Sequence, residues 1–274
     1  MKKSSRPDTP TRAVFFKWLH AGAIDPQGRF AWPTDKGRPG SWVSGSWVAM
    51  PGISGSRLGG LPYEIDQELW LVELDELIAA VPFSIPQELG ELDGLVEQSE
   101  LRLLARRGRL LTQVPTWTLR AAQEFAAECA AEARGRVLEA LRDAEHLVEV
   151  AATDDLALVP TRQTDGPSRA IDPSPGGHAI GALRHAEILA RIWRDAVAEA
   201  ASNEVHLGAA FASAAALCRA AVARTYAESL EPSSLPRAQD VALHAYLEER
   251  RRQARWLQSR LGLGEAIHEA ARAA

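Results

Sequence analysis

Polar side chains that could bind or transform a small molecule gather in the first third of the chain. His20, Arg57, Tyr63 and Glu73 flank or lie on short apolar runs that are typical of strands. An imidazole, a guanidinium, a phenol and a carboxylate at strand ends are groups that can orient a polar ligand. We therefore predict that these four residues line a ligand-binding site.

Glu73 permits a more specific hypothesis. ADP-ribosyl transfer uses a small mixed domain in which an early His or Arg holds the nicotinamide cofactor and a late Glu steers the sugar. The sequence "VELD" at 72–75 offers such a glutamate. The same carboxylate can equally face solvent or pair with Arg106, and no complete motif selects the transferase.

Other catalytic signatures are absent from the sequence. It has no Gly-x-Ser-x-Gly elbow, no phosphate loop with Gly-Lys-Ser/Thr, no His-Glu-x-x-His and no calcium loop. His178 and His185 share one predicted helix face, but two helical turns separate them by about 10 Å along the axis, too far for one metal ion. We expect neither a metal site nor a cofactor.

The stretch "ERRRQARWLQSRLGLGE" at 249–265 concentrates arginines near the end of the chain. Helical spacing places one apolar face on Tyr246, Leu247, Arg250, Ala254, Leu257 and Leu261. The other arginines then lie on the solvent-exposed face of the helix, where Glu248 and Glu249 can pair with them. We favour a structural amphipathic helix. The alternative is an interaction surface of Arg252, Arg255 and Trp256 for an acidic partner or nucleic acid.

The first half of the chain must position these groups with strands and turns. "AVFFKWL" and "ELWLVEL" are short, rich in aromatic and branched residues, and bounded by turn formers, so we predict two strands. "SELRLLARRGRLLTQV" fits a hairpin with Gly108 at its tip, or a helix that ends at Gly108 before a strand; we favour the hairpin. Trp18, Trp32, Trp42, Trp47 and Trp70 could line a binding pocket for a flat ring, but we favour a role in the core.

The second half changes to alanine, leucine, glutamate and arginine, the residues that favour helices. Thr118 is the predicted N-cap of one long helix, or of two helices joined near Gly135. Further helices are expected at 179–202, 204–230 and 236–261. The prediction is an α+β fold: a flexible N-terminus at 1–13, a small mixed strand-rich domain at 14–115, and an antiparallel helical bundle at 116–274 with a long loop at about 153–177.

Charge and cysteine usage exclude several broad classes. A net charge of -5 lacks the positive field of a general nucleic-acid binder, so nucleic acid is disfavoured. Cys129 and Cys218 lie far apart in helical patterns, which predicts two reduced, buried thiols. No signal-peptide core follows the basic N-terminus and no apolar run approaches membrane-spanning length, so we expect a cytoplasmic protein without membrane contact.

Five blocks in the same order resemble an uncharacterised family of actinobacterial hypothetical proteins over nearly the whole chain. They are "FFKWLHAGAIDPQGRFAWP", "LPYEIDQELWLVELD", "LRLLARRGRLLTQVPTW", "AAQEFAAECAAEA" and "ERRRQARWLQSRLGL". The family carries a Cys-Arg-x-Gly-Ile-His-Ala-Cys segment just before the block at Leu61, where this chain has "MPGISGSRLGG". Metal or redox chemistry based on that segment is therefore not expected here.

The sequence leads to two functional hypotheses. The leading one is a cytoplasmic, non-enzymatic protein that binds a protein partner or assembles with itself. The alternative is a small-molecule-binding or NAD-dependent ADP-ribosyltransferase-like enzyme with its site in the N-terminal domain.

Overall fold

The computed structural model describes residues 12–26, 30–34, 39–44, 52–89, 96–153, 175–202, 207–230 and 235–273. They belong to two compact units. The first, called the sheet unit, comprises residues 1–84, 92–123 and 251–274, and the second, called the helical unit, comprises residues 85–91 and 124–250. Residues 1–11 of the expected flexible N-terminus and most of the expected loop at 153–177 lie outside the described residues, whereas Arg12 and Ala13, which were expected to be flexible, begin a strand.

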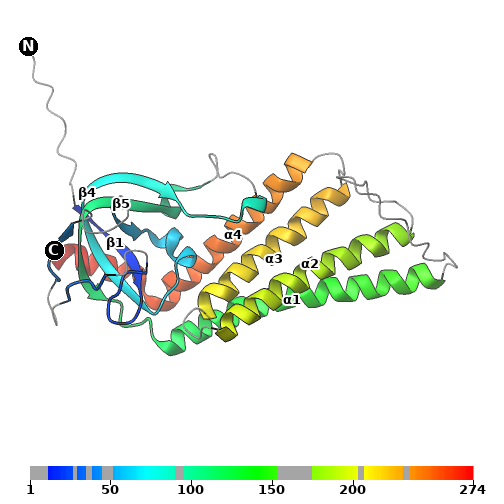
Figure 1. The fold of residues 1–274 in the computed structure, drawn as a ribbon, viewed down its shortest axis with the longest axis horizontal. Helices are drawn as coiled ribbons and strands as arrows, with labels where there is room; N and C mark the ends of the chain where they lie inside the picture. The colour runs from blue at the N-terminus through cyan, green and yellow to red at the C-terminus, as the bar shows by residue number, and fades with distance from the viewer. Residues whose placement is uncertain are drawn as a thin grey trace, which may run out of the picture. The chain divides into compact units, whose positions relative to one another are not determined.

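A five-stranded antiparallel sheet forms the centre of the sheet unit and, with the helices that follow it, confirms the α+β prediction. Its strands are β1 (Arg12–Leu19), β2 (Val43–Ser44), β3 (Ile53–Ser56), β4 (Glu68–Pro82) and β5 (Leu101–Gln113). The strand order is β2-β5-β3-β1-β4, and β4 also pairs with β5. Since β3 and β4 each pair with both β1 and β5, four strands close into a ring. Figure 1 shows β4 and β5 as long, curved strands.

The two apolar runs predicted as strands are confirmed. "AVFFKWL" lies in β1 and "ELWLVEL" begins β4. They pair antiparallel, with Phe15 opposite Val72 and Leu19 opposite Glu68. Every β4 residue from Leu71 to Asp75 is buried, as expected for a strand that is covered on both faces.

The predicted hairpin at Gly108 is wrong, because β5 runs through this glycine without a turn. Gly108 lies opposite both Val43 of β2 and Leu74 of β4. A Cβ atom there would lie 2.7 Å from Ile53 Cγ2 and 3.2 Å from Leu74 Cδ2. Glycine is therefore needed for close packing of the sheet rather than for a positive φ angle.

The inner face of the sheet forms a compact apolar core that fixes the strands. Its buried members are Phe15, Leu19, Ala23, Trp32, Ile53, Val72, Leu74, Leu103, Ala105 and Leu110. Burial of each large apolar side chain stabilises the fold by about 1.5–3 kcal/mol. Trp18 and Trp32 are core residues as predicted, whereas Trp42 and Trp70 are only partly buried and Trp47 lies outside the described residues.

Long helices make up the helical unit, and Figure 1 shows them running alongside one another. They are α1 (Leu119–Thr153), α2 (Pro175–Ser202), α3 (Leu207–Leu230) and α4 (Leu235–Leu261), of which α1 and α4 each contribute one end to the sheet unit. Thr118 Oγ1 accepts a hydrogen bond from the Ala121 N–H at 3.2 Å, which confirms the predicted N-cap. α1 continues through Gly135, so the choice between one helix and two is settled in favour of one.

α3 is built largely from small apolar residues. Its buried residues include Ala210, Ala212, Ala214, Ala215, Ala216, Cys218 and Ala220. Among the described residues, it is the one helix whose length and composition would allow it to cross a membrane, which the sequence analysis did not anticipate. Of its most apolar 18 residues, 44% are buried, and the core helix of a soluble protein can have the same length and composition.

A further helix, α5 (Leu263–Ala273), was missed by the sequence analysis. Gly262 separates it from α4 and has a φ of +65°, in the left-handed region that favours glycine. The segment from Arg251 to Ala274 belongs to the sheet unit, whereas the sequence-based boundary places it with the helical bundle.

Candidate functional site

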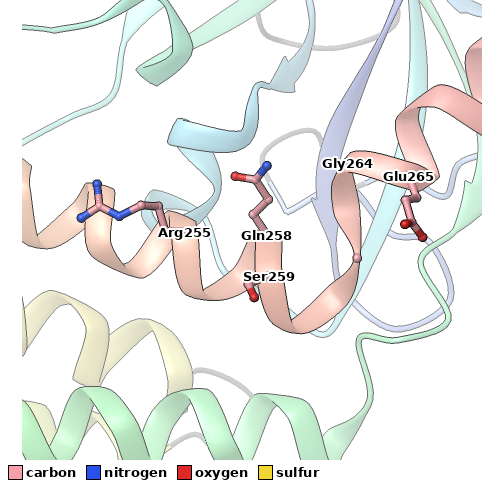
Figure 2. Close-up of a pocket in the computed structure, with 6 residues that line it drawn as sticks. Arg255, Gln258, Ser259, Gly264 and Glu265 are labelled. Atoms are coloured by element: carbon pink, nitrogen blue, oxygen red, sulfur yellow. The ribbon is translucent and has the colours of Figure 1, made fainter.

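A hollow of about 350 Å³ lies where α4 ends and α5 begins, within the sheet unit. Figure 2 shows Arg255, Gln258 and Ser259 on α4, with Gly264 and Glu265 following on α5. These residues and Gly262 line the hollow, which is wide open to solvent. Its lining offers hydrogen-bond donors and acceptors and one charge of each sign.

The opposite side of α4 is anchored in the protein, which holds the lining residues in place. Ala254, Leu257 and Leu261 are buried, as the predicted apolar face requires, and Leu263 at the start of α5 is fully buried. Thr116 Oγ1 donates a 2.8 Å hydrogen bond to the Leu261 carbonyl, which has no partner inside a helix that stops there. The hollow therefore rests on fixed backbone.

Arg251 provides a second anchor for the end of α4. Its Nε and a terminal nitrogen donate to the two carboxylate oxygens of Glu100 at 2.7 and 3.1 Å, and Glu97 lies 3.4 Å away. The hydrogen bond to Glu100 raises the pKa of Arg251. Because Glu100 is buried, this two-point contact is among the stronger polar interactions of the sheet unit.

The three residues of the predicted interaction surface lie on this part of α4. Arg255 is exposed and lines the hollow, while Arg252 and Trp256 are partly buried and make further contacts. Glu249, one of the expected helical partners of the arginines, is fully buried and accepts a 3.1 Å hydrogen bond from Arg219 of α3. This pairing across two helices was not predicted.

His20, the first of the four predicted ligand residues, forms a pair with a buried carboxylate. Its Nδ1 lies 2.9 Å from Asp66, and the Gln67 N–H donates to the same carboxylate at 2.7 Å. His20 is partly exposed, at 38% of its side chain. Asp66 can fix the orientation of the imidazole, an arrangement that suits proton transfer but needs a reacting group beside it.

Arg57 and Tyr63 lie at the two ends of the short helix η2 (Leu58–Tyr63). Arg57 is exposed, and its carbonyl accepts the Gly60 N–H at 3.0 Å. The Tyr63 ring stacks on Phe83 with ring centres 4.9 Å apart. Packing on Phe83 gives Tyr63 a structural role in holding η2 against the end of β4.

Glu73 lies inside β4, opposite Val14 of β1 and Arg109 of β5. Arg109 Nε donates to Glu73 at 2.6 Å, and the carboxylate is 5% exposed. The suggested partner Arg106 is wrong, because Arg106 instead lies 4.0 Å from Glu76. His20 follows the β1 residue Leu19, opposite Glu68, so Glu73 and His20 are roughly 20 Å apart along the strands and do not share one site.

A cluster that the sequence analysis missed surrounds Trp42 on the outer face of the sheet. The guanidinium carbons of Arg12, Arg107 and Arg109 lie 5.3, 5.0 and 5.0 Å from the centre of its ring. Such distances are typical of cation–π contacts. The sequence singled out Trp42 only as a core residue or as part of an aromatic pocket, and no pattern placed these three arginines beside it.

A buried polar group lies at Lys17, inside the sheet unit. Lys17 Nζ contacts Asp25 at 2.9 Å and donates to Ser54 Oγ at 3.0 Å and to the Ser54 carbonyl at 3.2 Å. The Trp32 indole N–H donates to Asp25 at 3.3 Å. Because Lys17, Asp25 and Ser54 are all buried, we interpret this group as a structural ion pair satisfied by hydrogen bonds.

The two cysteines and His185 of the helical unit are packed as structural residues. Cys129 and Cys218 are free and buried, as predicted, and burial raises the pKa of the Cys218 thiol to about 12. His185 Nδ1 lies 2.9 Å from Thr225 Oγ1, and burial lowers its pKa although Asp143 opposes the shift. The described residues contain no group of three or more His, Cys, Asp or Glu that could hold a metal ion.

Comparisons with known proteins add no relative from which a function could be transferred. No family model, no curated protein and no solved structure matches the chain.

Proposed function

We propose that this chain is a cytoplasmic, non-enzymatic interaction protein that binds a segment of another protein, or of a second copy, at the end of α4. The observation that carries the proposal is the hollow lined by Arg255, Gln258, Ser259 and Glu265. A hollow in a protein surface can receive side chains of a partner. Contacts in such a hollow contribute much of the binding energy when its walls are held in place.

The chemistry of the lining suits a polar segment. Arg255 at one end of the hollow can donate to a carboxylate or carbonyl of the partner, and Glu265 at the other end can accept from an amide or a basic side chain (Figure 2). Gln258 and Ser259 between them offer neutral hydrogen-bonding groups. Opposite charges at the two ends favour one orientation of the bound segment.

The surroundings of the hollow also suit protein recognition. Arg252 and Trp256 belong to the residue types that are enriched at interfaces, and both are partly accessible beside Arg255. Leu257 and the Arg251–Glu100 contact anchor the buried side of α4. Because the helix is already ordered, less conformational entropy is lost when a partner binds.

A substitution that fills the hollow tests the proposal. Ser259→Trp places a large ring among the lining residues, and Ser229→Trp on the exposed end of α3 is the matched control. Purification from native cell extract and analytical ultracentrifugation should detect a partner or self-association with the original chain and the control. Loss of that species only in Ser259→Trp supports the proposal; equal recovery with all three proteins contradicts it.

The NAD-dependent ADP-ribosyltransferase-like alternative stays a prediction. Glu73, its proposed sugar-binding group, is held by Arg109 at 2.6 Å. A ligand that binds only the folded state raises the melting temperature, so a thermal-shift series with NAD decides between the two hypotheses. Stabilisation by NAD, with NAD consumption lost in Glu73→Gln, would favour the enzyme.

A further inference from the structure

The outer face of the sheet places cationic groups from separate strands around one indole ring. Because Val43 of β2 lies opposite Gly108, the preceding Trp42 comes beside Arg109 of β5. The β4 residue Asp75 lies opposite both Arg12 of β1 and Arg107 of β5. The strand pairing thus holds these groups at one spot, which we call the arginine–tryptophan face.

The charges on this face are not balanced. Arg109 and Glu73 form a close pair at 2.6 Å, with 20% and 5% of their side chains exposed. Asp75 is shared by two arginines, at 3.6 Å from Arg12 and 3.8 Å from Arg107. Among the described residues of this face, two guanidinium groups therefore share one carboxylate, which leaves one positive charge in excess.

The two arginines that share Asp75 keep donors that a ligand could use. Their distances to the carboxylate are longer than a hydrogen bond, and 55% and 40% of the Arg12 and Arg107 side chains are exposed. Asp75, at 8% exposed, is more deeply buried than either arginine. Contact with the Trp42 ring restrains both guanidinium groups, which lowers the entropy lost when an anion binds.

We propose that Arg12 and Arg107 bind the phosphate group of a small molecule on the arginine–tryptophan face. A phosphate has oxygens in a tetrahedral arrangement, so it can accept from two guanidinium groups that approach from different strands. A carboxylate offers only two oxygens, which lie in one plane, and the Asp75 carboxylate already lies near both guanidinium groups. One excess charge suits a single phosphate, whereas a nucleic-acid strand is held by many phosphate contacts.

Isothermal titration calorimetry of the full chain tests this site with inorganic phosphate, adenosine monophosphate and a single-stranded oligonucleotide. Inorganic phosphate or the mononucleotide should bind, and the double variant Arg12→Gln/Arg107→Gln should weaken that binding by at least about tenfold, because each arginine supplies charge-assisted hydrogen bonds. Arg106→Gln is the matched control. It changes an arginine of the same strand, 73% exposed, that pairs with Glu76, and it should leave the affinity unchanged.

Asp75→Asn provides a second variant with an opposite expectation. It removes the carboxylate that competes with the ligand for the two arginines, so phosphate should bind more tightly than to the original chain. If thermal unfolding shows that the double variant does not fold, Arg107→Gln alone should weaken binding at least about threefold. The proposal is overturned by absent binding at millimolar phosphate, by equal affinity in the arginine variants, or by binding of the oligonucleotide alone.

Discussion

Arg251 binds both carboxylate oxygens of Glu100, at 2.7 and 3.1 Å, and joins the end of α4 to the residue that precedes β5. Glu100 is 1% exposed, so removal of the arginine would leave a buried negative charge without this partner. We predict that Arg251→Ala lowers the free energy of unfolding by about 3 kcal/mol, measured by urea denaturation.

The matched control for that prediction is Arg255→Ala, because Arg255 is an exposed arginine on the same helix. It should change stability by less than about 0.5 kcal/mol. Equal effects of the two substitutions would show that the Arg251–Glu100 contact does not stabilise the sheet unit.

Gly108 and Gly135 should respond in opposite directions to alanine. The Gly108 Cβ would lie 2.7 Å from Ile53 Cγ2, so Gly108→Ala should destabilise the protein by about 1–3 kcal/mol. A Cβ at Gly135 in α1 would meet nothing within 4 Å, and Gly135→Ala should stabilise it by about 0.5–1 kcal/mol. Urea denaturation of both variants checks the signs, and a stabilising Gly108→Ala would argue against the close strand packing.

His185 should make stability depend on pH. Its pKa in the folded state lies below the ordinary value of 6.5, mainly because of burial, so the unfolded chain binds the proton more readily. The contribution of His185 is therefore fully present above about pH 6.5 and is lost as the pH falls from there through the folded-state pKa. Urea denaturation at about pH 7.5 and about pH 5.5 should show a smaller loss on acidification for His185→Gln than for the original chain.

An equal loss in the two proteins would contradict the assignment to His185. His185→Gln is chosen because an amide can keep a hydrogen bond with Thr225, whose hydroxyl lies 2.9 Å from Nδ1. The nearby Asp143 carries the charge that opposes the shift, so Asp143→Asn should lower the His185 pKa further, as NMR titration can measure.

The two thiols should be inert in the folded protein. Cys129 and Cys218 are fully buried, and a pKa of about 12 leaves almost no Cys218 thiolate at neutral pH. Maleimide labelling followed by mass spectrometry should find no adduct in buffer and two adducts in guanidinium chloride. Rapid labelling of Cys218 in buffer would contradict its placement inside the helical unit.

The parts of the fold that the sequence predicted are those with local periodicity or local caps. β1, the start of β4 and the Thr118 cap follow from residues that are close in sequence, and so does the buried stripe of α4 through Leu257. β5 was misjudged because the same glycine can serve a turn or a close approach, and only the neighbouring strands decide. Gly108 meets Ile53 of β3, which lies far away in sequence.

The candidate sites depend on such distant contacts to a greater degree. No pattern in the sequence pairs Glu73 with Arg109, or brings Arg12 and Arg107 to Trp42, because strand register selects these neighbours. The hollow requires α5 to follow the left-handed Gly262, and that helix was not predicted from the sequence. Arg255 was named from its helical position alone, and its place at the edge of a hollow came from the structure.

Site-specific photo-crosslinking tests the central claim, that the hollow at the end of α4 receives a segment of another protein chain. A photoreactive amino acid replaces Arg255 in one protein and Arg142, an exposed arginine of α1, in the control. After irradiation in native extract, the proposal predicts a covalent adduct with a second polypeptide from position 255 and none from position 142; mass spectrometry tells a partner from a second copy. No adduct at 255, or the same adducts from both positions, would contradict it.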